Sequence, residues 1–83
     1  MTNAFLGIDT GSISTKGVII TPDGTIIARS YLWTEGNPTD AARRVVEDLG
    51  SQINKEEINV VAVGATGSAR RLVGAILGAT VVK

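Results

Sequence analysis

The sequence predicts a single α/β domain built on a mixed β-sheet, with its elements in the order βββαβαβ. Three observations lead to this class. Runs rich in Val, Ile and Thr, separated by short turn signals, occupy residues 1–33. A stretch with helical periodicity follows them, and a near-continuous apolar run comes after that helix. Strands that alternate with helices after an initial group of strands are typical of a sheet with both antiparallel and parallel pairs.

The three initial strands are expected at Ala4–Asp9, Thr15–Ile20 and Thr25–Trp33. Between the second and the third lies "TPDGT", residues 21–25, in which Pro, Asp and Gly stand in the order that favours a tight turn. Strands joined by such short connections pair with their neighbours in antiparallel fashion. The first part of the chain is therefore expected to form an antiparallel meander.

A helix of about four turns is expected from Pro38 to about Gln52. Asn37 is a good N-cap, proline suits the first helical position, and Asp40 places a negative charge in the first turn. The apolar positions recur at helical spacing and predict one buried face: Ala41, Ala42, Val45, Val46, Leu49 and Ile53.

The remaining elements are a central strand at Ile58–Thr66, a second helix at Ser68–Gly78 and a short closing strand at Ala79–Lys83. The resulting sheet has five strands with flanking helices. No helix follows the last strand to cover the second face of the sheet. We therefore expect residues 1–83 to form one N-terminal subdomain of a longer protein.

The composition excludes several classes of function. Eight basic and eight acidic residues give a formal net charge of zero, which argues against a nucleic-acid binder or a polybasic membrane binder. The chain has no cysteine and no histidine, so thiolate metal sites and a histidine general base are absent from it. No apolar run has the length of a membrane span, and the N-terminus does not resemble a signal peptide, so a cytoplasmic location is expected.

The stretch "GIDTGSISTK", residues 7–16, carries the chemistry. Asp9 ends a strand, and Gly11 permits a tight turn whose successive N–H groups can form a concave site for phosphate oxygens. Lys16 can reach the same phosphates as a point charge. A carboxylate so near phosphate is explained if Asp9 holds Mg²⁺, through water, because Mg²⁺ keeps several waters and bridges to phosphate. The alternative is a plain hairpin turn with local side-chain hydrogen bonds, because so short a motif often occurs by chance.

Two segments resemble a known family. "GIDTGSISTKGVIITPDGTIIARS" and "VGATGSARRLVGAILGATVVK" are similar to the N-terminus of activators of 2-hydroxyacyl-CoA dehydratases and of ATPase subunits of benzoyl-CoA reductases. These belong to the actin, hexokinase and heat-shock chaperone superfamily. The resemblance covers essentially the whole chain and implies a ribonuclease H-like, actin-like ATPase half-domain. In "ATGSAR" this sequence has Ala69 where the family usually has glycine, which weakens any role carried over to that bend.

The resemblance implies an ATP- or ADP-binding protein that uses Mg²⁺. In the family, ATP hydrolysis drives an electron from a four-iron, four-sulfur cluster to a partner dehydratase or reductase. A chain without cysteine cannot hold that cluster, so cluster, partner and a homodimeric state are implied for the parent protein only. The nucleotide cleft of the superfamily lies between two half-domains, so the isolated chain is expected to be inactive as an ATPase.

The predicted nucleotide-binding residues fall in two groups. The turn contributes the first, and the resemblance adds two residues after the central strand: Asp9, Gly11, Ser12, Ile13, Ser14, Thr15 and Lys16, with Thr66 and Gly67. The alternative for this segment, which the residue types favour, is that Thr66 or Ser68 caps the second helix. Arg70 and Arg71 could contact the partner or the nucleotide, but a solvated helix face is the favoured interpretation. Two other functions stay open: half of a sugar or acetate-type kinase, and a non-enzymatic actin-like scaffold. Two cysteines further along the parent chain would favour the activator.

Overall fold

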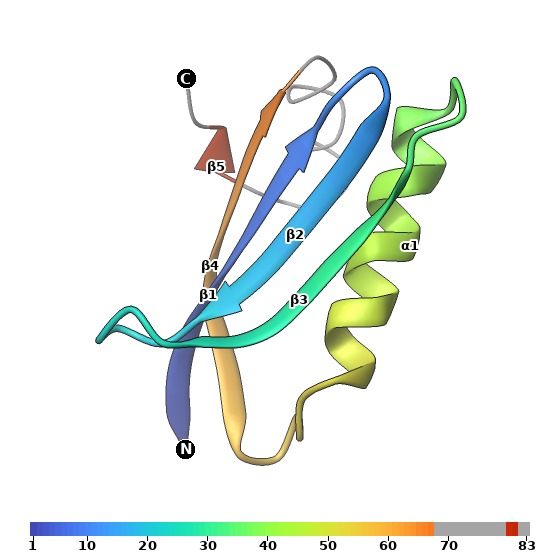
Figure 1. The fold of residues 1–83 in the computed structure, drawn as a ribbon. Helices are drawn as coiled ribbons and strands as arrows, with labels where there is room; N and C mark the ends of the chain where they lie inside the picture. Colours follow the sequence, from blue (N-terminus) through green and yellow to red (C-terminus); the bar gives the residue numbers. More distant parts are fainter. Residues whose placement is uncertain (68–79, 82–83) are drawn as a thin grey trace.

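The computed structural model describes residues 1–67 and 80–81. Their elements follow one another as β1 (Thr2–Thr10), β2 (Ser14–Ile20), β3 (Ile26–Trp33), α1 (Pro38–Ser51), β4 (Ile58–Gly67) and β5 (Thr80–Val81). The strands form one mixed sheet in the order β3-β2-β1-β4-β5, and α1 lies against one side of it (Figure 1). The helix α1, the one helix among these residues, is not long and apolar enough to cross a membrane.

The meander is confirmed by the strand register. β1 pairs with β2 and β2 with β3 in antiparallel fashion, whereas β1 pairs with β4 and β4 with β5 in parallel. The long crossover from β3 to β4 carries α1, as a parallel connection requires. Four of the strands have seven residues or more, and β5 adds two residues beside β4.

The turn between β2 and β3 is built by the residues that predicted it. Gly24 has a φ of +90°, in the left-handed region that glycine enters without steric cost. The hydroxyl of Thr21 donates a hydrogen bond to the Asp23 carboxylate, and the amide of Thr25 donates another over 3.1 Å. These bonds, the Thr21 hydroxyl first, hold the pKa of Asp23 below its ordinary value of 3.8 because they stabilise the ionised form.

The helix α1 begins as the sequence predicts. The Asn37 side chain accepts a hydrogen bond from the amide of Asp40 over 3.1 Å, and proline occupies the first turn. On the exposed face Arg43 pairs with Asp40 and with Glu47. The buried face consists of Ala41, Ala42, Val45 and Leu49. The helix continues through Gly50 to Ser51.

The core lies between α1 and the sheet. Its buried apolar residues come from one face of three strands and from the helix: Ala4, Leu6, Ile8, Ile19, Ala28, Val45 and Leu49. Gly17 lies beneath the helix, where a Cβ atom would stand 2.5 Å from Val45 Cγ1 and 2.8 Å from Leu49 Cδ1. A glycine at this point of β2 therefore lets helix and sheet approach closely.

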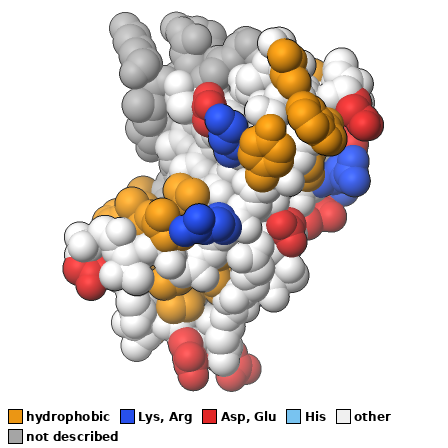
Figure 2. Space-filling view, in the orientation of Figure 1, with side chains coloured by type: hydrophobic (Ala, Val, Ile, Leu, Met, Phe, Trp, Pro, Cys, Tyr) orange, Lys and Arg blue, Asp and Glu red, His pale blue; other side chains and the backbone are white. Residues whose placement is uncertain are grey.

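Several large hydrophobic side chains remain exposed, and hydrophobic groups gather in two places on the face drawn in Figure 2. Val61 is one of these exposed side chains. A register shift in the β1–β4 ladder pairs Ala4 with Val60 and Phe5 with Ala62, so Val61 has no opposite residue. The others among the described residues are Met1, Phe5, Ile13, Ile26, Tyr31 and Trp33.

The outer edge of the sheet is β3, and the residue after α1 is bonded to it. Gln52 accepts a hydrogen bond from the amide of Arg29 through Oε1 over 3.2 Å and donates one from Nε2 to the Arg29 carbonyl over 2.7 Å. This side chain ties the end of the helix to the middle of the strand.

Comparison with the expected elements shows small differences at the boundaries. The first strand begins at Thr2 rather than Ala4, and the second includes Ser14. The helix predicted at Ser68–Gly78 lies outside the described residues. Of the closing strand predicted at Ala79–Lys83, the described part is Thr80–Val81. The described elements confirm an α/β half-domain with a mixed sheet.

Candidate functional site

The candidate site begins at the turn between β1 and β2. The last pair of that ladder joins Thr10 to Thr15, and residues 11–13 connect the strands. The amide of Gly11 donates a hydrogen bond to the carbonyl of Ser14 over 2.8 Å. A Cβ atom on Gly11 would lie 2.6 Å from that carbonyl oxygen, so the turn can close in this form only around a glycine.

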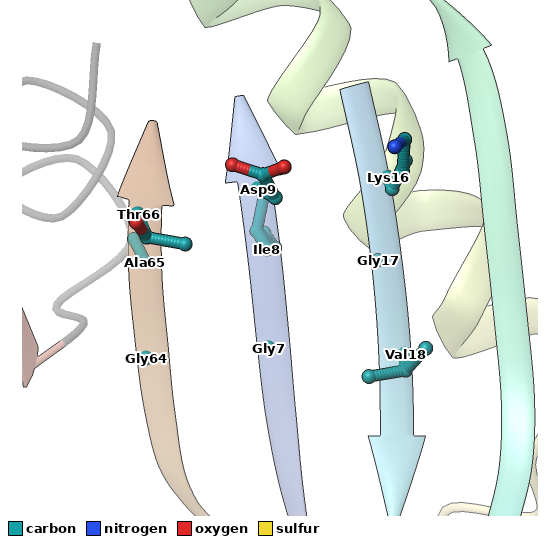
Figure 3. Close-up of a pocket in the computed structure, with 9 residues that line it drawn as sticks. All are labelled: Gly7, Ile8, Asp9, Lys16, Gly17, Val18, Gly64, Ala65 and Thr66. Atoms are coloured by element: carbon teal, nitrogen blue, oxygen red, sulfur yellow. The ribbon is translucent and has the colours of Figure 1, made fainter. Parts of the chain in front are cut away.

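Three polar residues lie side by side on adjacent strands next to this turn. Asp9 of β1 is opposite Lys16 of β2 and opposite Thr66 of β4. All three are exposed, and Figure 3 shows them at the same level of the sheet. Since directly opposite residues have Cβ atoms about 5 Å apart, an acidic, a basic and a hydroxyl side chain start from one small area of the sheet.

A pocket of about 340 Å³ lies beside these residues. Part of its floor is backbone, because Gly7 of β1 lies opposite Gly64 of β4, and on the other side of Gly7 the pocket is bordered by Val18 of β2 (Figure 3). A Cβ atom on Gly7 would have the Cγ2 atom of Val18 as its nearest neighbour, at 3.8 Å. The missing side chains at Gly7 and Gly64 leave the hollow beside Asp9, and Val18 borders it.

The charged groups of Asp9 and Lys16 form no ion pair within the described part of the chain. Among residues 1–67 and 80–81, ion pairs join Arg43 to its two acidic neighbours and involve neither Asp9 nor Lys16. The same residues contain no cluster of three acidic side chains that could enclose a metal ion. One exposed carboxylate next to a lysine therefore suits a hydrated cation shared with a bound anion better than a metal held by protein ligands alone.

The predicted residues do not all face this area. Ser12 and Ile13 are exposed in the turn, and Ser14 is half-buried at the start of β2. Thr15 is fully buried, and its hydroxyl lies 2.9 Å from the hydroxyl of Thr34. Its side chain is thus on the helix side of the sheet, away from Asp9 and Lys16. Gly67 is the last residue of β4 and lies opposite Thr10.

Sequence reasoning missed Thr34, which follows β3 directly and is 3% exposed. Its hydroxyl and its amide both reach the turn that carries the predicted phosphate site. No local pattern marks this threonine, because the contact spans about twenty residues of sequence. The register of β2 against β3 is what brings it there: Ser14 lies opposite Trp33, the residue before Thr34.

No known family model matches the sequence, and no curated protein matches it. Solved structures do. The activator of the 2-hydroxyisocaproyl-CoA dehydratase from Clostridium difficile, with bound ADPNP, is 30% identical over 83% of this chain and 25% of its own, with a TM-score of 0.69. Component A of the (R)-2-hydroxyglutaryl-CoA dehydratase from Acidaminococcus fermentans is 27% identical over 96% of this chain and 30% of its own, with a TM-score of 0.66.

A sugar kinase shares the fold at lower identity. The ROK family glucokinase from Streptomyces griseus, in complex with glucose and AMPPNP, is 19% identical over 95% of this chain and 32% of its own, with a TM-score of 0.67. The chain thus spans about a third or less of the length of these structures. It has the fold of an actin-like ATPase half-domain, and it is similar to the N-terminal region of 2-hydroxyacyl-CoA dehydratase activators.

Proposed function

We propose that this chain is the ATP-binding N-terminal subdomain of a 2-hydroxyacyl-CoA dehydratase activator. The observation that carries the proposal is the row formed by Asp9, Lys16 and Thr66 beside the glycine turn. Support comes from the similarity to an activator that was solved with bound ADPNP. In this proposal, residues 1–83 form one domain of a cytoplasmic protein.

Each group of the site has a role in this proposal. The turn binds phosphate oxygens through its backbone N–H groups, since the amides of Ser12 and Ile13 donate to no acceptor among the described residues. Lys16 adds a charge-assisted contact to a β- or γ-phosphate. Asp9 positions hydrated Mg²⁺, which supplies charge neutralisation to the phosphates. Thr66 and Gly67 border the same area from β4.

The electron-transfer part of the activity belongs to other portions of the parent protein. The chain has no cysteine, so a four-iron, four-sulfur cluster is held elsewhere. The partner dehydratase or reductase, the acyl-CoA substrate and a homodimeric assembly belong to the same wider proposal. What this chain contributes is nucleotide binding.

Calorimetric titration of the full-length parent protein with Mg²⁺ and ATP, comparing the wild type with Lys16→Met, tests the proposal. Methionine keeps the apolar stem and loses the charge, and a lost charge-assisted contact of ~1.5–3 kcal/mol corresponds to roughly ten- to hundredfold weaker binding. Lys55→Met is the matched control, because Lys55 is exposed and lies beside Gly50 at the end of α1. Thermal melts check that both variants fold. Unchanged ATP affinity in a folded Lys16→Met protein would remove Lys16 from the site.

The second candidate is half of a sugar or acetate-type kinase, which the structural likeness to the glucokinase favours at the level of fold. The continuing sequence of the parent discriminates between the two. An activator requires a pair of cysteines there, whereas a kinase requires a carboxylate that can act as a base on its sugar or acid substrate.

A further inference from the structure

Thr34 makes four hydrogen bonds at the end of β3. Its amide donates to the carbonyl of Ile13 over 2.7 Å, and its hydroxyl donates to the carbonyl of Gly11 over 2.8 Å. The same hydroxyl lies 2.9 Å from that of Thr15, and its carbonyl accepts from the amide of Asn37 over 3.1 Å. A hydroxyl has one proton to donate, and the Thr34 hydroxyl donates it to the carbonyl of Gly11. Thr15 is therefore the donor in the bond between the two threonines.

These bonds fix the direction of two peptide groups in the turn. A peptide unit is planar and trans, so its C=O and its N–H point in opposite directions, and the described chain has no cis peptide. The carbonyl of Gly11 points to Thr34, so the amide of Ser12 points away from it. The carbonyl of Ile13 also points to Thr34, so the amide of Ser14 points away as well.

We propose that Thr34 is the positioning residue of the phosphate-binding turn. It holds two carbonyl oxygens inward, where they cannot repel an anion, and thereby turns N–H groups of the turn outward, where they can bind one. A turn without this anchor is able to flip its peptide planes and present carbonyl oxygens to the phosphates. The inference rests on the proposed function for the identity of the anion, a nucleotide phosphate.

The test uses Thr34→Val, which keeps the shape of the side chain and removes its hydroxyl, and Thr34→Ser, which restores the hydroxyl. Ser30→Ala is the matched control, since it removes a buried hydroxyl from the same strand away from the turn. Thr34→Val is expected to weaken binding of ATP with Mg²⁺ by about fivefold or more, because its hydroxyl bond to Gly11 is worth about 1 kcal/mol. Thr34→Ser and Ser30→Ala are expected to stay within about twofold of the wild type.

A second readout needs no nucleotide. The amide of Gly11 is bonded to the carbonyl of Ser14, so it is protected from hydrogen exchange in the wild type. Thr34→Val is expected to accelerate its exchange, whereas Ser30→Ala leaves it unchanged. A folded Thr34→Val protein with wild-type ATP affinity and wild-type exchange at Gly11 overturns the positioning role. A full-length parent protein that binds no ATP overturns the proposed function instead, and the exchange at Gly11 still decides the role of Thr34.

Discussion

Replacing Gly17 by alanine adds a methyl group at the contact between β2 and α1. The new Cβ atom would stand 2.5 Å from Val45 Cγ1 and 2.8 Å from Leu49 Cδ1, whereas carbon atoms in good contact lie about 3.5–4.0 Å apart. Val45 and Leu49 are both fully buried, so neither has open space to enter. The β-branched valine has few alternative rotamers, and therefore the helix itself has to move outward by about 1 Å.

Overpacking of this kind costs on the order of 1–3 kcal/mol of unfolding free energy. In a domain of this size each kcal/mol lowers Tm by roughly 4–8 °C, so the variant should melt about 4–24 °C below the wild type. Thermal unfolding followed by circular dichroism, together with urea titration at one temperature, measures both quantities.

Gly7→Ala is the matched control. The same methyl group on β1 would meet the Cγ2 atom of Val18 at 3.8 Å, an ordinary contact distance. A strand glycine replaced by alanine without strain raises stability by about 0.4–1 kcal/mol, because the unfolded chain loses conformational freedom. The two variants should therefore shift Tm in opposite directions. Equal shifts, or a Gly17→Ala protein as stable as the wild type, would contradict the close approach of α1 to the sheet.

Three further outcomes are expected. Asn37→Ala removes the cap bond to the Asp40 amide and should lower the urea-derived unfolding free energy by about 1 kcal/mol, and no change would show that the cap is unimportant. Thr21→Val should raise the pKa of Asp23 towards 3.8 in an NMR titration. Because the folded pKa is lowered, Asp23 stabilises the fold above its unfolded pKa, and this contribution is lost as pH falls through the folded pKa. The unfolding free energy of the variant should therefore depend less on pH in the acid range. The purified 83-residue chain should show no sustained ATP turnover, and turnover abolished by Asp9→Asn would contradict that expectation.

The strand order and the helix could be predicted from sequence because their signals are local. Asn37 and Pro38 mark the start of α1, and the Pro-Asp-Gly turn marks the hairpin between β2 and β3. The continuous apolar run of β4 predicts a strand with neighbours on both sides, and the structure places it between β1 and β5. These elements bring Asp9 next to Lys16 and Thr66.

The internal support of the site could not be predicted in the same way. The sequence motif groups Thr15 with its neighbours in the turn, yet the alternation of side chains along β2 places it on the opposite face from Lys16. Thr34 meets the turn through the register of β2 against β3, and that ladder contains a register shift at Ile19 and Ile20. A shift of this kind changes which residues lie opposite one another along the rest of the ladder, so the partner of Ser14 cannot be found by counting from the turn alone.

The hydrogen bonds between Gln52 and Arg29 have a consequence for association between molecules. An edge strand exposes a row of backbone donors and acceptors, and another chain can pair with them and extend the sheet. In β3 the outward N–H and C=O of Arg29 are already taken by one side-chain amide, which imitates the backbone of an absent sixth strand. An incoming strand would have to displace Gln52 before it could continue past the midpoint of β3. The Gln52 side chain therefore opposes aggregation by strand addition at this edge of the sheet.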